Sequence, residues 1–191
     1  MKSELKHIYL MGLLIFISGC AASGKLAQGP NAVKYPADIS SAKIDRQQAE
    51  ALEKDLVALN HGSARQEARK VAETALQTSA FLSEEYELVR PPLLHNIFVK
   101  MGWRNRGLCY QWTEDLMSHL MALQLKDYRL RWGVAHRGSD LREHNTVVIT
   151  ANGQSFEDGL VLDPWRNSGK LYWVVVKKDT YPWIELPREE W

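Results

Sequence analysis

Hydrophobic residues recur at helical spacing over 41–102, and strand-like patterns appear only in the second half of the chain. Hydrophobic stripes at helical spacing are typical of amphipathic helices that bury one face. A third short helix is expected over 93–101, after Pro91-Pro92. We therefore predict a helical part over 41–102. The two longer stripes are formed by Ala49, Leu52, Leu56 and Leu59 and by Ala68, Val71, Ala75 and Leu76.

Strand signals begin after one further helix, predicted over 109–125. Alternating, β-branched and aromatic residues predict strands over 128–135, 145–150, 159–162 and 171–176, with glycine turn signals between them. The segment 181–187 contains two prolines and is predicted to be a loop that packs over the sheet. Helices followed by strands indicate an α+β fold, in which N-terminal helices and one cysteine-bearing helix pack on an antiparallel sheet. We place this domain at 41–191.

Residues 1–19 have the pattern of an export signal. Lys2 and Lys6 precede an apolar run over 8–17, and about ten residues cannot cross a bilayer core that needs about 20. The run ends in Ile17-Ser18-Gly19-Cys20, which resembles the bacterial lipobox. That resemblance implies cleavage before Cys20 and lipidation of this residue, which would attach the protein to a membrane.

Composition narrows the partners that the domain can have. Hydrophobic residues make up 45% of the chain, charged residues 25%, and the net charge is +1. These values indicate a globular domain and argue against a nucleic-acid partner. Residues 20–40 are rich in Ala, Gly, Pro and Ser, which predicts a flexible, lipid-anchored tether. Ala21 and Ala22 are typical of lipoproteins sent to the outer membrane, so we expect an envelope protein that faces the periplasm.

Cys109 is the one cysteine besides Cys20. If Cys20 carries lipid, Cys109 has no disulfide partner, and such a thiol in an exported protein is either buried and inert or kept for its reactivity. Cys109 opens a predicted helix, whose positive dipole end lowers the pKa of a thiol. It is therefore a candidate nucleophile, and the alternative is a small buried hydrophobic residue.

A cysteine nucleophile needs a base, for which His136 and His144 are the candidates. His144 opens one predicted strand and Asp163 ends the next. With a four-residue loop over 152–155, these two residues would lie directly opposite each other, and with a two-residue loop they would be diagonal on the same face. In either register Asp163 can orient the His144 ring, so the hairpin favours His144.

Together these residues resemble the transglutaminase-like superfamily, a papain-related group of cysteine enzymes. The resemblance rests on Gly107-Leu108-Cys109 before a helix, on His144 at a strand start, and on Leu162-Asp163-Pro164-Trp165 on the following strand. The spacings, 35 residues from Cys to His and 19 from His to Asp, agree with it. One departure is Asn145, where the family commonly has an aromatic residue.

The resemblance implies acyl transfer at a Cys109–His144–Asp163 triad. Cys109 would attack an amide carbonyl, and water or an amine would then resolve the thioester, as in a cysteine peptidase or amidase or in a transglutaminase. The Cys109 backbone N–H would form an oxyanion hole together with Trp103 or Gln111. The expected substrate is a peptide or protein amide in the envelope.

Two other interpretations stay open on the sequence. A non-catalytic binding or scaffold lipoprotein could use the tryptophans, all seven of which lie at or beyond Trp103, although core packing also accounts for them. Asp115 and His119 stand four residues apart on a helix, but no HExxH or paired-histidine motif accompanies them. We therefore expect neither a metal nor a cofactor.

Overall fold

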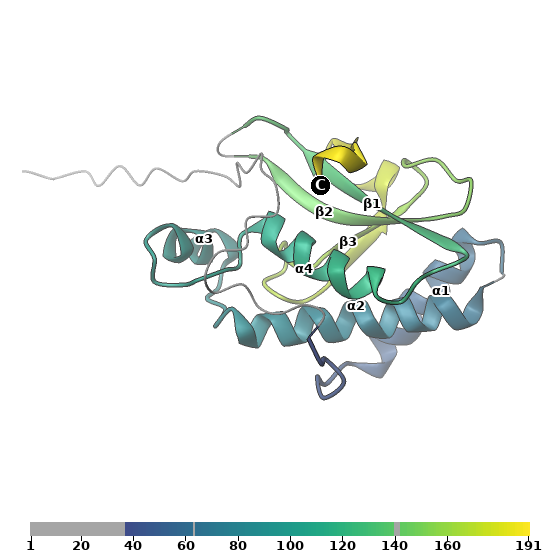
Figure 1. The fold of residues 1–191 in the computed structure, drawn as a ribbon, viewed down its shortest axis with the longest axis horizontal. Coiled ribbons are helices and arrows are strands. Elements are labelled where there is room, and N and C mark those ends of the chain that lie inside the picture. The colour runs from purple at the N-terminus through teal and green to yellow at the C-terminus, as the bar shows by residue number, and fades with distance from the viewer. Residues whose placement is uncertain (1–36, 63, 140–141) are drawn as a thin grey trace, which may run out of the picture.

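A computed structural model describes residues 37–191, apart from residues 63, 140 and 141 (Figure 1). The predicted signal over 1–19, the lipidation residue Cys20 and most of the tether therefore lie outside the described residues. None of the helices in the described part of the chain is both long and apolar enough to span a bilayer.

The helical stripes form the expected helices. The described residues contain α1 (Arg46–Leu59), α2 (Arg65–Glu85), α3 (Pro92–Lys100) and α4 (Cys109–Met121). The Asp45 carboxylate caps α1 by accepting the Gln47 N–H at 2.9 Å. Apolar residues of α1 and α2, such as Leu52 and Val71, are fully buried. The helical prediction is confirmed because these stripes pack against each other and against α4.

The strands form one antiparallel sheet, which confirms the predicted α+β class. They are β1 (Tyr128–Ala135), β2 (His144–Ala151), β3 (Leu160–Asp163), β4 (Tyr172–Val175) and β5 (Trp183–Leu186). Their order across the sheet is β4-β3-β2-β1-β5. The loop predicted over 181–187 is wrong, because this segment contains β5. Pro182 and Pro187 flank the strand, and an edge strand tolerates prolines because one of its sides needs no partner.

The central strand β2 is buried along its whole length. Alternate residues of a strand point to opposite faces. Val147 and Ile149 pack with the helices, on what we call the helix face, whereas Val148 packs with Val161 and Trp183 on the opposite, back face. Figure 1 shows α2 and α4 together on one side of the sheet. His144 and Asn145 are neighbours at the start of β2 and therefore belong to different faces.

The register between β2 and β3 differs from both predicted hairpins. Val147 pairs with Leu162 and Val148 with Val161, so Asp163 is level with Thr146 rather than with His144. The connection is longer because it contains two successive turns, closed by the N–H groups of Gln154 and Gly159. A shift of two residues preserves the face, so His144 and Asp163 remain diagonal neighbours.

Candidate active site

His144 and Asp163 form a buried pair on the back face of the sheet. His144 Nε2 lies 2.7 Å from Asp163 Oδ2, and both side chains are almost fully shielded from solvent. Burial would raise the pKa of Asp163, but the facing His144 ring and the Arg166 guanidinium outweigh it and hold that pKa below its ordinary value. The carboxylate therefore stays ionised and fixes the orientation of the imidazole ring.

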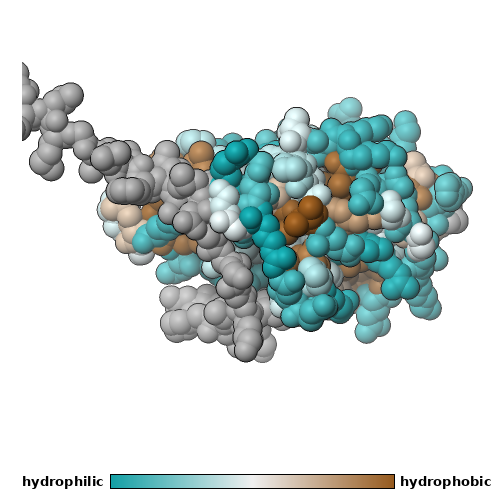
Figure 2. All heavy atoms as spheres, turned by 90° about the horizontal axis from the view of Figure 1, so that it is seen from above, coloured by the Kyte–Doolittle hydropathy of each residue, from teal (hydrophilic) through white to brown (hydrophobic). Residues whose placement is uncertain are grey.

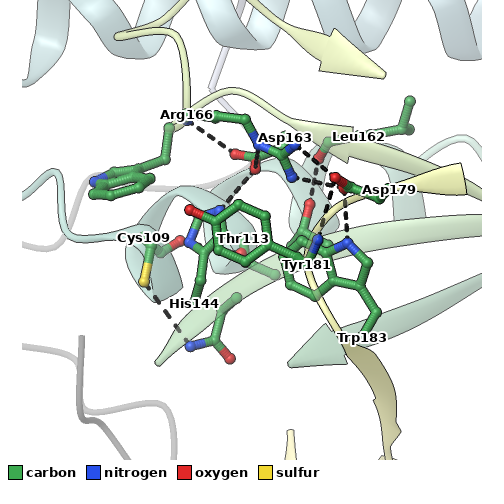
Figure 3. A network of polar contacts seen from close by, with 12 residues as sticks. Cys109, Thr113, His144, Leu162, Asp163, Arg166, Asp179, Tyr181 and Trp183 are labelled. Carbon is green, nitrogen blue, oxygen red and sulfur yellow. Dashed lines mark hydrogen bonds and ion pairs between the residues drawn. The ribbon is translucent and has the colours of Figure 1, made fainter. Parts of the chain in front are cut away.

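A second carboxylate completes the network behind Asp163 (Figure 3). Arg166 donates to Asp163 from Nε and from its backbone N–H, at 3.0 and 3.1 Å, and its two terminal nitrogens reach Asp179 at 2.9 and 2.7 Å. Asp179 also accepts the Trp183 indole N–H at 2.8 Å. Although burial opposes it, these bonds lower the pKa of Asp179 to about 2. Arg166 thus serves two buried carboxylates at once.

Aromatic rings enclose the His144 imidazole. The ring centroids of Trp165, Tyr181 and Trp183 lie 4.7, 5.1 and 5.4 Å from that of His144. Tyr181 also stacks on Trp183 and lies under the Arg166 guanidinium. These rings restrict rotation of the imidazole and exclude water from the His144–Asp163 bond.

Cys109 is the first residue of α4 and is fully buried. Its Sγ lies 3.9 Å from the Glu143 carbonyl oxygen and 4.0 Å from Asn145 Nδ2, beside the two residues that flank His144. The sulfur is disulfide-bonded, and the other cysteine of the sequence, Cys20, lies outside the described residues. The expectation that Cys109 lacks a disulfide partner depended on a lipid at Cys20, and it does not hold for this state of the chain.

The second nitrogen of His144 has a different environment from the first. Nδ1 is buried and has no hydrogen-bond partner among the described residues. Because Nε2 is engaged with Asp163, Nδ1 is the atom through which His144 can exchange a proton with another group. No hydrogen bond joins it to Cys109 in this state.

Neutral hydrogen bonds shape the loop that leads into Cys109. The Gln111 side-chain oxygen accepts the N–H groups of Gly107 and Leu108 at 2.8 and 3.0 Å, and Trp112 donates its indole N–H to the Gly107 carbonyl at 3.0 Å.

The His95 ring packs against the same loop, and its Nε2 lies 2.9 Å from the Arg106 carbonyl oxygen. Gly107 has φ +123°, and a Cβ there would collide with the His95 ring. This glycine is therefore required for both its conformation and its lack of a side chain.

The two predicted oxyanion donors differ in their surroundings. Gln111 uses its amide oxygen to cap the loop before α4. Trp103 is 58% exposed, its ring packs edge-on against Phe98, and it borders neither of the hollows described below. Trp103 is thus largely exposed to solvent, whereas Cys109 is fully buried.

The tryptophans of the second half do not form an open platform. Trp112, Trp132 and Trp183 are buried, and the exposed large hydrophobic side chains include Trp103 but no other tryptophan. Figure 2 shows a largely hydrophilic face with a small hydrophobic patch near its middle. Six of the seven indole N–H groups donate to acceptors within the protein, which favours core packing over ligand binding. The donors are Trp112, Trp132, Trp165, Trp173, Trp183 and Trp191.

Asp115 and His119 belong to a buried network of hydrogen bonds and ion pairs on α4. The Asp115 carboxylate accepts hydrogen bonds from Tyr86 and Arg106, and His119 Nδ1 lies 2.9 Å from the Asp115 carbonyl oxygen. Burial raises the pKa of the neighbouring Glu114, which is also paired with Arg106. Within the described ranges, no three His, Cys, Asp or Glu side chains are placed to hold a metal ion together.

Two hollows border the start of β2. A groove of about 620 Å³ is lined by Glu143, His144, Trp165 and Tyr181, among others. A smaller cavity of about 130 Å³ is bordered by Glu143, Asn145 and residues of α4, β1 and the C-terminal segment. Glu143 borders both hollows, and its carbonyl oxygen lies 3.9 Å from the fully buried Cys109 sulfur, which itself lines neither hollow.

The fold and the site define an α+β domain in which a helix-terminal cysteine lies next to a buried His–Asp pair. No family model, curated protein or solved structure matches this chain.

Proposed function

We propose that the domain is a cysteine-dependent acyl-transfer enzyme, with Cys109 as nucleophile, His144 as base and Asp163 as the residue that orients His144. The observation that carries this proposal is that the two ring nitrogens of His144 have different hydrogen-bonding environments. Nε2 is held by a buried carboxylate at 2.7 Å, whereas Nδ1 is buried and has no partner among the described residues. A buried polar nitrogen left in this way is costly, so a proton-transfer partner for it is expected.

The chemistry starts from the reduced thiol. His144 Nδ1 takes the proton from Cys109 Sγ, and the thiolate forms a bond to the carbonyl carbon of an amide. His144 then gives its proton to the leaving amine as the C–N bond breaks, which produces a thioester. Water or a second amine attacks the thioester and releases Cys109. The outcome is hydrolysis in the first case and amide exchange in the second.

The disulfide at Cys109 limits the proposal to the reduced protein. A thioether-linked lipid on Cys20 would remove that sulfur from thiol–disulfide chemistry, so lipidation would favour the active form. We also propose that the mature protein is anchored in the cell envelope and acts on peptide or protein amides there. Incorporation of radiolabelled palmitate into the expressed chain, lost in Cys20→Ala, would support the anchor, and equal labelling of both would contradict it.

The catalytic proposal is tested by alkylation of Cys109. The full chain, reduced and held in detergent, is treated with iodoacetamide across pH, and modification of Cys109 is followed by peptide mass spectrometry. We expect the rate to rise with a midpoint below the ordinary thiol value of about 8.5. In His144→Ala the midpoint should move up, which lowers the rate at pH 7 by roughly tenfold or more.

His61→Ala is the matched control, because His61 is exposed in the turn after α1. It should alkylate as the wild type does, and thermal melting should show that all three proteins are folded. Slow alkylation of the wild type, with a midpoint at or above the ordinary value and no dependence on His144, would overturn the proposal. Cys109 would then be a structural cysteine.

A further inference from the structure

Asn145 lies on the helix face of β2, next to Cys109 and one residue after the proposed base. It is 5% exposed, and its Nδ2 lies 4.0 Å from the Cys109 sulfur. The sequence resemblance gave this position no role, since an aromatic residue is common there. A polar amide in so buried a position needs an explanation of its own.

The orientation of the Asn145 amide is fixed by Trp132. An indole N–H can donate but not accept, so the group that faces it must be the amide oxygen. Trp132 Nε1 lies 2.7 Å from Asn145 Oδ1, and the Trp132 ring is itself held against Trp191. The amide nitrogen is therefore directed to the other side, toward Cys109.

The contacts of this nitrogen suggest that it serves a ligand. Within the part of the chain that the structure describes, Asn145 Nδ2 reaches a sulfur, which is a weak acceptor, and no oxygen. A buried amide donor gains little from such a contact. An oxygen atom that entered between the sulfur and the amide would satisfy it better.

We propose that Asn145 is the side-chain donor of the oxyanion hole, and this inference rests on the acyl-transfer function proposed above. When the Cys109 thiolate adds to a carbonyl carbon, the electron pair of the C=O bond moves onto the oxygen. Asn145 Nδ2 and the Cys109 backbone N–H then donate hydrogen bonds to that oxygen without transferring a proton. When the C–N bond breaks, the carbonyl re-forms and both donors are unchanged.

The distance between the Asn145 amide and the sulfur fits an oxyanion that accepts from this amide. Oxyanion donors lie about 2.7–3.1 Å from the oxygen, and this oxygen is bonded to the same carbon that the sulfur attacks. A donor at 4.0 Å from Sγ is therefore neither too close nor too far. Asn145 also borders the cavity of about 130 Å³, on the side of β2 away from the His144 groove. The carbonyl oxygen would point to this side, with the leaving amine toward His144.

Two probes separate this role from simple activation of the thiol. Iodoacetamide reacts at a saturated carbon and forms no oxyanion, whereas p-nitrophenyl acetate reacts at a carbonyl carbon and forms one. Both are applied to the reduced full chain, and p-nitrophenol release reports acylation. In Asn145→Ala we expect the ratio of acylation rate to alkylation rate to fall about 100- to 1,000-fold, as for loss of one oxyanion donor.

Trp132→Phe is a second, milder variant that removes the indole N–H and keeps most of the ring. It frees the Asn145 amide to turn, so the same ratio should fall by roughly tenfold, a fraction of the loss of a whole donor. Trp173→Phe is the matched control, because its N–H donates to Asp55 on α1, and it should leave the ratio unchanged. If Asn145→Ala does not fold, Trp132→Phe still decides the question.

The outcomes distinguish this inference from the proposed function. An unactivated, His144-independent thiol in the wild type would overturn both. An activated thiol whose acylation-to-alkylation ratio is the same in wild type, Asn145→Ala and Trp132→Phe would overturn the Asn145 assignment and leave the triad standing.

Discussion

The two sides of the candidate site hold His144 and Cys109 by different physical means. On the back face, His144 is fixed by a charged network in which Arg166 bridges Asp163 and Asp179. On the helix face, the loop before Cys109 is shaped mainly by neutral hydrogen bonds and by the conformation of Gly107, with one ion-paired residue, Arg106, at its start. The first side depends mainly on charge and protonation, and the second depends mainly on backbone conformation and space. Each side should therefore fail under a different perturbation.

The largest effect is expected at the loop before Cys109. Gly107→Ala places a side chain at φ +123° and against the His95 ring, so strain and overlap should together lower the free energy of unfolding by about 4 kcal/mol. Chemical denaturation measures this. Gly153→Ala is the control, because Gly153 also has positive φ but open space around it, and should cost about 1 kcal/mol. Equal losses in the two variants would show that the contact with His95 is unimportant.

A somewhat smaller effect is expected when the charged side loses its cation. Arg166→Met leaves Asp163 and Asp179 buried without their guanidinium partner, which should cost about 3 kcal/mol of unfolding free energy. Arg131→Met removes a more exposed arginine that pairs with Glu185 and should cost less than about 1 kcal/mol. The comparison between the two sides would be wrong if both variants unfolded at the same denaturant concentration.

The smallest effect is a pH dependence that comes from Asp179 on the charged side. The pKa of Asp179 is about 2 in the folded protein against an ordinary 3.8, so its stabilisation is complete above pH 3.8 and is lost as the pH falls toward 2. This loss amounts to about 2 kcal/mol. In Asp179→Asn, the free energy of unfolding, measured by denaturation from pH 5 to pH 2, should therefore fall less steeply than in the wild type. Glu189→Gln, on an exposed terminal turn, should keep the wild-type slope, and a steep loss in Asp179→Asn would refute the assignment.

The sequence predicted the elements better than the details of their pairing. Periodicity identifies helices and buried strands because each element must bury one stripe or face, whatever its partners are. The register of β2 against β3 escaped prediction because it depends on how many residues two successive turns consume. The strand β5 escaped because its flanking prolines indicate a break, and its pairing with β1 is a contact between residues about 50 positions apart.

The candidate site, like the fold, could be predicted from the sequence only in part. His144 and Asp163 could be paired from the sequence because a shift of two residues leaves a strand's faces unchanged. The supporting residues Asp179, His95 and Asn145 could not be found, since each acts through a contact made only by the folded chain. The motif Gly107-Leu108-Cys109 did carry a usable signal, because a glycine two residues before a helix start often marks a special backbone conformation.

The place of β5 in the sheet has a consequence for the order of events during biosynthesis. The residues that hold His144 all follow it in the chain, from Asp163 through Asp179 to Trp183. A nascent chain that has not yet released residue 183 carries both Cys109 and His144, but it lacks residues that hold His144 in place. Whatever reactivity the pair has must therefore arise late, once residues 163–183 have folded against His144.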